Sequence, residues 1–204
     1  MTERRYSLVL AAAIVALAGG TAWAHTVSSA SVQSVPEPGS TAPVTIALTV
    51  FQPDGSSASS PVPVILHSHG WGGSRATSVG GDIEKFLDSG IGVVSIDQRG
   101  HGESGGRAHV EDPEFEGQDV KRVIDLVATL PWVELDAPGD PVLGAIGGSY
   151  GGGYQWIAAL TEVRDTGTTR FNALAPDISW NDLPRSLAPS GVVRGPWVIA
   201  LYAA

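Results

Sequence analysis

A single serine lies within a run of glycines in the stretch GAIGGSYGGGYQW, residues 144–156. Gly147-Gly148-Ser149-Tyr150-Gly151 fits the pattern G-x-S-x-G, between an apolar run and a stretch with helical spacing. On a sharp strand-to-helix turn, small neighbours let other segments approach, and the serine hydroxyl stands clear of the sheet. The N-terminus of the following helix favours negative charge. The pattern therefore favours a nucleophile at Ser149 over a glycine loop without chemistry.

A serine nucleophile needs N–H donors for the oxyanion of its tetrahedral intermediate. The backbone N–H of Tyr150, the residue after the serine, is one candidate. The second is the N–H of Trp71 in the glycine-rich stretch HGWGG (69–73), which follows another apolar run. We predict that Tyr150 and Trp71 form an oxyanion hole, with Gly70 shaping the loop. The alternative is a plain glycine turn in which Trp71 only packs.

The apolar patterning predicts the elements that position these residues. Strands are expected at 44–53, 61–70, 91–100, 140–149 and 171–179, of which 61–70 and 91–100 are predicted to be buried. Helices are expected at 78–90, 114–130 and 152–165. This alternation predicts a mostly parallel sheet with helices on both faces. Chemistry in such sheets collects at the carboxyl ends of the strands, where HSHGWGG, DQRGHGESGG and GGSYGG lie.

The N-terminal stretch has the pattern of a secretory signal. Arg4 and Arg5 precede an apolar run from Leu8 to Leu17, and Ala22 and Ala24 form an A-x-A site. We predict a signal peptide over residues 1–24 and a secreted or periplasmic protein without stable membrane association after cleavage. A retained N-terminal anchor is the alternative. Residues 25–43 are predicted to be an extended, weakly structured leader, and residues 44–204 to form one domain.

Composition excludes several classes of partner. The net charge of −9 argues against nucleic acid and anionic membranes, and the absence of cysteine removes disulfides and thiolate metal sites. Gly100, Gly102 and Gly105 fit G-x-G-x-x-G, but the next expected helix begins too late for a dinucleotide site. We expect no cofactor and no metal; the oligomeric state is not indicated. Asp97 and Arg99 are assigned structural roles, and the acidic stretch 111–116 is predicted to be a solvated helix start.

Three stretches resemble one known family. DQRGHGESGG (97–106), GGSYGG (147–152) and ISWNDLPRSLAPSGVV (178–193) are similar to motifs of α/β-hydrolases of the X-prolyl dipeptidyl-peptidase and cocaine-esterase-like family. The similarity runs from about residue 44 to the last residue. It implies a three-layer α/β-hydrolase fold, a small peptide or ester substrate and an acyl-enzyme mechanism. The resemblance does not distinguish a peptidase from an esterase.

A serine nucleophile also needs a general base, and the positions of the histidines do not fit the order that this fold requires. In this fold the catalytic triad follows the chain order Ser, Asp or Glu, His. All five histidines precede Ser149: they are His25, His67, His69, His101 and His109. We therefore expect a domain without its C-terminal strands and triad histidine, with little activity of its own. The alternatives are His69 as the base, Asp177 as a triad acid rather than a loop carboxylate, and a non-catalytic binding module with this fold.

Overall fold

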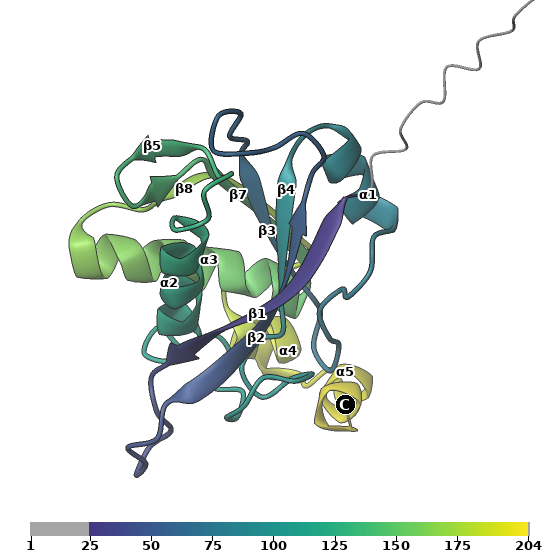
Figure 1. Ribbon diagram of the computed structural model, residues 1–204. Helices are drawn as coiled ribbons and strands as arrows, with labels where there is room; N and C mark the ends of the chain where they lie inside the picture. Colours follow the sequence, from purple (N-terminus) through teal and green to yellow (C-terminus); the bar gives the residue numbers. More distant parts are fainter. Residues whose placement is uncertain (1–24, 204) are drawn as a thin grey trace, which may run out of the picture.

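The computed structural model describes residues 25–203, so the predicted signal peptide lies outside the described residues and stays a prediction. A six-stranded sheet with the order β1-β2-β4-β3-β7-β8 forms the centre of the molecule (Figure 1). Its strands are β1 (Thr26–Ser34), β2 (Val44–Gln52), β3 (Val64–Ser68), β4 (Gly92–Ile96), β7 (Leu143–Gly148) and β8 (Phe171–Asp177). A short hairpin of β5 (Leu135–Ala137) and β6 (Asp140–Pro141), which the sequence did not indicate, stands beside it.

The strand pairings confirm a mostly parallel sheet. Strand β3 pairs in parallel with β4 and β7, and β7 pairs in parallel with β8. Only β2 runs the other way, because it pairs with both β1 and β4 in antiparallel fashion. The carboxyl ends of β3, β4, β7 and β8 therefore meet at one edge of the sheet.

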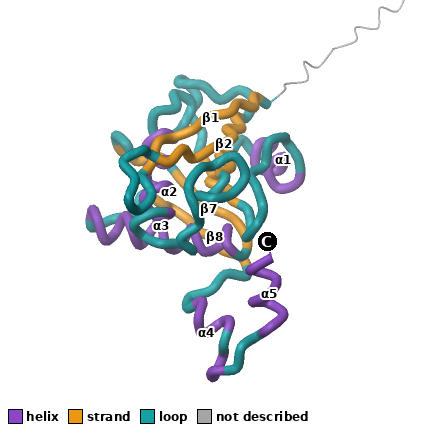
Figure 2. Tube along the Cα trace, turned by 90° about the horizontal axis from the view of Figure 1, so that it is seen from below, coloured by secondary structure: helices purple, strands orange, loops and turns teal. Residues whose placement is uncertain are grey.

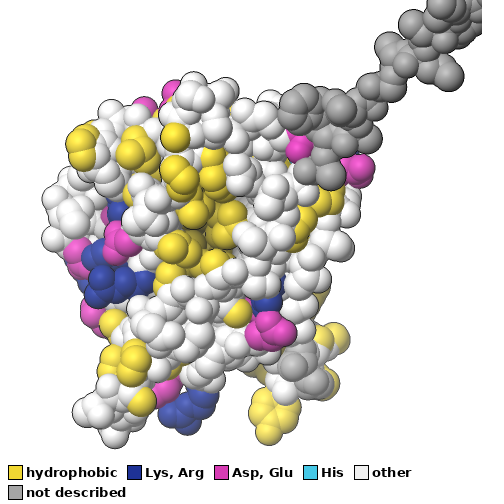
Figure 3. All heavy atoms as spheres, in the orientation of Figure 1, with side chains coloured by type: hydrophobic (Ala, Val, Ile, Leu, Met, Phe, Trp, Pro, Cys, Tyr) yellow, Lys and Arg dark blue, Asp and Glu magenta, His cyan; other side chains and the backbone are white. Residues whose placement is uncertain are grey.

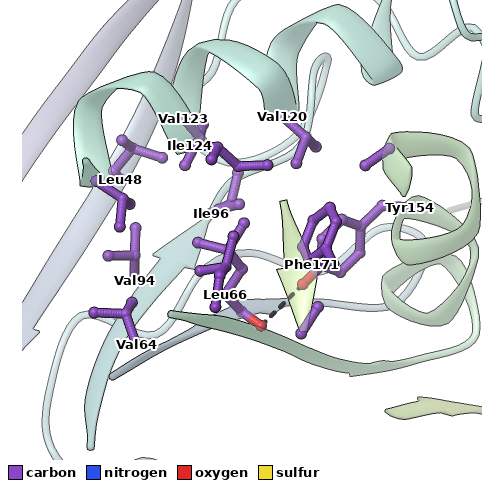
Figure 4. Close-up of a cluster of buried hydrophobic side chains, with 14 of the residues drawn as sticks. Leu48, Val64, Leu66, Val94, Ile96, Val120, Val123, Ile124, Tyr154 and Phe171 are labelled. Atoms are coloured by element: carbon purple, nitrogen blue, oxygen red, sulfur yellow. Dashed lines mark hydrogen bonds between the residues drawn. The ribbon is translucent and has the colours of Figure 1, made fainter. Parts of the chain in front are cut away.

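Helices cover both faces of the sheet, as expected. Helix α1 (Gly81–Asp88) packs Ile83 and Leu87 against Phe51 and Val93 on one face. Helices α2 (Glu116–Val127) and α3 (Tyr150–Thr166) cover the other face and enclose the larger core (Figures 1 and 4). In that core the Tyr154 hydroxyl donates to the Leu66 carbonyl at 2.9 Å, which joins α3 to β3 (Figure 4).

The prediction of a weakly structured leader over residues 25–43 is wrong for Thr26–Ser34. These nine residues form β1, which pairs with β2 along its whole length, from Thr26↔Gln52 to Ser34↔Val44. The composition is rich in serine, but Ala30 and Val32 pack against the large core. Pairing with an apolar neighbour, rather than the hydrophobicity of β1 itself, orders this strand.

The chain after β8 stands apart from the layered body. Residues 178–203, called here the α4–α5 segment, contain α4 (Leu183–Leu187), a 3-10 turn at Pro189–Gly191 and α5 (Gly195–Ala203). Figure 2 shows this segment projecting away from the sheet, and Figure 3 shows apolar side chains at the lower right, where Figure 1 places α5. Within residues 25–203, no helix has the length and apolar character needed to cross a membrane.

Candidate active site

The strand ends bring the predicted stretches together. Ser68 at the end of β3 pairs with Ile96 at the end of β4, and Gly148 at the end of β7 pairs with Asp177 at the end of β8. Each pair is followed by a loop at the same edge of the sheet. The β3 loop (residues 69–75), the β4 loop (residues 97–104) and the turn at Ser149 therefore meet, as the sequence predicted.

Ser149 has the backbone of a strained strand-to-helix turn. Its φ is 57° and its ψ is −117°, a region that residues with a side chain rarely adopt. The turn is held on both sides. The Ser149 N–H donates to the Asp177 carbonyl at 2.9 Å, and the Ser149 carbonyl accepts from Gly152 N–H at 2.9 Å and Gly153 N–H at 3.0 Å. Because the surroundings over-determine this conformation, the hydroxyl has a defined place at the start of α3.

The predicted glycines of the turn differ in how much they are needed for the close approach of β3. A Cβ atom on Gly151 would lie 2.5 Å from the Ser68 carbonyl oxygen and 2.8 Å from that of His69. A Cβ atom on Gly147 would lie 2.8 Å from the same Ser68 carbonyl oxygen. A Cβ on Gly148 would meet nothing closer than 3.8 Å. Gly147 and Gly151 are therefore required for the close approach of β3 to the turn, whereas Gly148 has space around it.

Both candidate oxyanion donors lie beside Ser149. Tyr150 is the first residue of α3, so its N–H has no intrahelical acceptor. The Trp71 N–H has no acceptor in the described part of the chain. A Cβ on Gly70 would lie 3.8 Å from Ser149 Cβ, so the residue before Trp71 lies beside the serine. Trp71, Ser149 and Tyr150 also line one cavity of about 200 Å³, called here the Ser149 cavity. Two free backbone donors beside a strained serine are the arrangement that oxyanion stabilisation needs.

His69 holds the β3 loop in place and is not free to act as a base. The Gln98 N–H donates to His69 Nε2 at 3.2 Å, so Nδ1 carries the proton and donates to the Gly70 carbonyl at 2.8 Å. Burial lowers the pKa of His69, with a further contribution from His101 nearby. The same Gly70 carbonyl accepts from Gly73 N–H at 3.0 Å. Neutral His69 thereby ties the β3 loop to the β4 loop.

The other four histidines also have polar partners other than Ser149, although the ring of His101 lies beside Trp71 and Tyr150. His67 Nδ1 bonds to Ser95 Oγ at 2.9 Å, His101 Nδ1 to the Arg99 carbonyl at 3.1 Å, and His109 Nε2 to Glu37 at 2.7 Å. His25 lies 3.4 Å from Asp88, far from the site. No side chain among residues 25–203 forms a hydrogen bond with Ser149 Oγ. The exposed carboxylate of Asp177 lies near Gly148 and binds no histidine among the same residues.

Buried ion pairs fix the loops around the site. The Asp97 carboxylate accepts from the Arg75 guanidinium and from Glu103 N–H, so it joins the β3 and β4 loops. Arg99 is fully buried and forms two hydrogen bonds with Asp119 at 2.8 and 2.6 Å and one with Glu37 at 3.0 Å. Asp97 and Arg99 thus have structural roles as expected, but with partners that sequence spacing does not reveal.

The acidic stretch 111–116 is not the solvated helix start that the sequence suggested. Glu116 is buried, accepts from the backbone N–H groups of His109 at 2.7 Å and Asp112 at 2.9 Å, and receives a longer bond from the Tyr150 hydroxyl at 3.4 Å. Burial, and next the nearby Glu116, raise the pKa of Glu111 well above its usual value. This correction follows from packing, because the start of α2 lies beneath the start of α3 rather than facing water.

The Ser149 cavity has apolar walls. Apart from Ser149 and the two aromatic residues Trp71 and Tyr150, it is lined by Val110, Trp180, Leu183, Leu187 and Leu201. A second cavity of about 380 Å³ shares Val110 and Trp180 with it and extends along α3 past Trp156. Sequence reasoning did not find the leucines, because they belong to a part of the chain without a clear period. In the described part of the chain, no three His, Asp or Glu side chains gather as ligands for a metal ion.

Comparisons with known proteins agree with this geometry. Residues 41–201 match the family model of the X-Pro dipeptidyl-peptidase (S15) family. The uncharacterized Escherichia coli protein YcjY is 32% identical over 101 residues, which are 49% of this chain and 31% of that protein. A CocE/NonD family hydrolase from Staphylococcus aureus superimposes with a TM-score of 0.60 at 18% identity, covering 80% of this chain and 29% of that one.

An esterase from Pyrococcus furiosus is similar with a TM-score of 0.55 and 22% identity, over 87% of this chain and 59% of that one. These likenesses establish the α/β-hydrolase fold. The chain spans about a third of the length of YcjY and of the staphylococcal hydrolase. With the family model covering most of the described residues, the chain belongs to the X-Pro dipeptidyl-peptidase (S15) family.

Proposed function

We propose that the protein is a serine hydrolase in which Ser149 attacks the carbonyl carbon of a small ester or peptide. The observation that carries the proposal is the strained Ser149, with φ 57°, flanked by the unpaired N–H groups of Tyr150 and Trp71 on one cavity. Preorganised N–H donors stabilise the negative charge that develops on the carbonyl oxygen. The N-terminus of α3 adds a favourable dipole at the same place.

The reaction forms an acyl-enzyme. Ser149 Oγ forms a bond to the acyl carbon, the bond from that carbon to the leaving alcohol or amine breaks, and the serine proton passes to a general base. Water then attacks the acyl carbon and restores the serine. The apolar walls of the Ser149 cavity suit an uncharged group on the substrate.

We propose that the base is none of the five histidines. Both ring nitrogens of His69, which lies next to Gly70, already bond to backbone groups. We therefore propose that the triad histidine comes from outside these 204 residues. The 204-residue chain alone should then turn over substrate slowly, because serine without its base loses most of its rate.

Rescue by imidazole tests the proposal. The purified chain is mixed with p-nitrophenyl acetate, with and without imidazole, and release of nitrophenolate is compared with that by Ser149→Ala. Because free imidazole can take the serine proton, we expect it to raise the serine-dependent rate by about tenfold to a hundredfold. The Ser149→Ala variant corrects for the direct reaction of imidazole with the ester.

Two results would overturn parts of this proposal. Equal rates for the wild-type chain and Ser149→Ala, at every imidazole concentration, would favour a non-catalytic binding module with this fold. Rapid turnover without imidazole, lost in a folded His69→Gln variant, would instead make His69 the base.

A further inference from the structure

Glu111 is a buried acidic residue that the proposed mechanism does not use. The residue is 8% exposed, and its two carboxyl oxygens are shielded from solvent and have no hydrogen-bond partner among residues 25–203. Its neighbour Glu116, by contrast, accepts from two backbone N–H groups. A carboxylate that leaves water without a partner loses its hydration free energy, so the charged form of Glu111 is costly where it lies.

The groups on α2 and the β4 loop do not offer Glu111 a counter-ion. Glu116 and Asp119 on α2 are buried carboxylates that disfavour a further negative charge. The buried Arg99 guanidinium already forms two hydrogen bonds with Asp119. The Gln98 amide favours the charged form, but burial, and next Glu116, outweigh it and raise the pKa of Glu111. The protonated form is therefore the one that fits these surroundings.

The side chain of Glu111 lies against the first turn of α3. A Cβ atom on Gly153 would lie 3.2 Å from Glu111 Cγ, so the carboxyl group packs directly on the helix backbone. The N–H of the same Gly153 donates to the Ser149 carbonyl at 3.0 Å. The groups of α3 that face Glu111 are the Tyr150 and Tyr154 hydroxyls, and burial, and next Glu111, raise the pKa of both. Glu111 thus contacts a residue that holds the nucleophile in place.

The backbone around Glu111 is strained. Val110 and Glu111 have φ values of 62° and 63°, in the left-handed region that such side chains rarely adopt. Strain of this kind persists only where the surroundings hold it. Glu111 also borders the second cavity of about 380 Å³. A turn of its side chain toward that cavity would relax the backbone and bring the carboxyl group toward water.

We propose that Glu111 is a neutral carboxylic acid at neutral pH, packed beneath the turn at Ser149, and that loss of its proton as the pH rises releases the first turn of α3. The proton passes to water. The carboxylate that remains faces Glu116 and Asp119, and it moves toward the second cavity. This movement removes the packing on Gly153, so the start of α3 responds to pH through a group that does not touch substrate.

The pH dependence of unfolding tests the buried proton. Because the pKa of Glu111 is higher in the folded chain than its ordinary value of 4.5, this residue lowers the stability of the wild-type chain as the pH rises above 4.5. Glu111→Gln keeps the shape and has no proton to lose. Relative to the wild-type chain, we expect its unfolding equilibrium constant to fall by up to tenfold for each pH unit, in urea titrations between pH ~5 and ~8.

Glu134→Gln is the matched control, since it removes the same charge at an exposed residue that forms no ion pair within the described chain. The ratio of its unfolding constant to that of the wild-type chain should stay constant over the same pH range. A constant ratio for Glu111→Gln as well would overturn the proposal. The carboxyl group would then titrate alike in the folded and the unfolded chain.

Infrared spectroscopy of the wild-type chain detects the proton even if Glu111→Gln does not fold. At neutral pH the exposed carboxyl groups are ionised, so we expect a C=O stretching band from one buried, protonated carboxylic acid. The absence of this band would overturn the proposal. A band that persists in a folded Glu111→Gln variant would assign the proton to Glu116 and would overturn it too.

Hydrogen exchange measured by NMR tests the release of α3. The Gly152 and Gly153 N–H groups bond to the Ser149 carbonyl, so their protection factors report whether the first turn is closed. We expect these factors to fall with rising pH in the wild-type chain and to stay constant in Glu111→Gln. Constant protection in both would overturn the release. None of these measurements uses hydrolysis, so failure of this proposal and failure of the proposed function can be told apart.

Discussion

Two walls of the Ser149 cavity are held in different ways. On one side, the β3 and β4 loops are joined by the Arg75–Asp97 ion pair and by the bond from Gln98 N–H to His69. On the other side, the α4–α5 segment exposes its apolar residues and connects to the body through the hydrogen bond from the Trp71 indole to the Leu201 carbonyl. The first wall carries the candidate donor Trp71 and lies beside the turn at Ser149, and the second wall lines the same cavity.

The difference shows that the two walls of the cavity are held with different rigidity. Oxyanion donors stabilise charge only if they are fixed before the reaction, which requires the buried ion pairs and hydrogen bonds of the loops. The α4–α5 segment makes one hydrogen bond to the body within residues 25–203, so this wall should be held less tightly. Substitutions in the two walls should therefore differ sharply in their effect on stability.

The largest expected effect is on the Arg99 ion pairs behind the β4 loop. Arg99→Ala leaves the buried Asp119 carboxylate without its partner, which should lower the free energy of unfolding by about 3–5 kcal/mol. Urea unfolding followed by circular dichroism measures this. Arg185→Ala in the α4–α5 segment, where the side chain makes no ion pair within residues 25–203, should change this free energy by about 0.5 kcal/mol or less. Similar losses of unfolding free energy for the two variants would contradict the difference between the two walls.

A smaller effect is expected where β3 meets the turn at Ser149. Gly151→Ala places a methyl group against two fixed carbonyl oxygens, so it should destabilise the chain by about 1–3 kcal/mol. Gly148→Ala, three residues earlier, introduces the same group at an ordinary contact distance of 3.8 Å from Asp177 and Ile178. It should stay within about 0.5 kcal/mol of the wild-type chain in the same urea titration. Equal effects would mean that the close approach of β3 does not depend on Gly151.

The pH dependence of stability gives a finer test of the fixed wall. Burial alone would raise the pKa of Glu37, but hydrogen bonds from Arg107 N–H, His109 and Arg99 outweigh it and lower that pKa to about 2. Since the pKa is lower in the folded state, Glu37 stabilises the fold above pH 4.5 and loses this contribution as the pH falls toward about 2. Glu37→Gln should flatten the acid side of the stability profile.

The control for this experiment is Glu134→Gln, since Glu134 is exposed and forms no ion pair in the described chain. Its profile of urea midpoint against pH should follow that of the wild-type protein. If Glu37→Gln kept the full wild-type slope between pH ~5 and ~3, Glu37 would not hold the Arg99 network as described.

Local sequence signals were sufficient to predict the tight strand-to-helix turn at Ser149. Ser149, Gly147 and Gly151 lie where an apolar run changes to helical spacing, and the strained φ and tight contacts of the turn follow from that local pattern. The meeting of the three glycine-rich strand ends was also predictable, because parallel neighbours place their carboxyl ends at one edge.

What the sequence did not reveal depends on distant partners. The role of the Trp71 indole depends on Leu201, which lies 130 residues further along the chain. Strand β1 is ordered by its pairing with β2, and the buried state of Glu111 and Glu116 results from the packing of α2 beneath α3. Charge and polarity within a short window predict exposure, whereas tertiary contacts decide it in these cases.

The central claim is that Ser149 attacks a carbonyl carbon, and trapping the acyl-enzyme tests it most directly. The purified chain is incubated with p-nitrophenyl acetate, digested with trypsin, and the peptide containing Ser149 is examined by mass spectrometry. Because a missing base slows deacylation as well, the account predicts an acetyl group that accumulates on Ser149. An unmodified Ser149 peptide, or acetylation spread equally over the other serines, would contradict it.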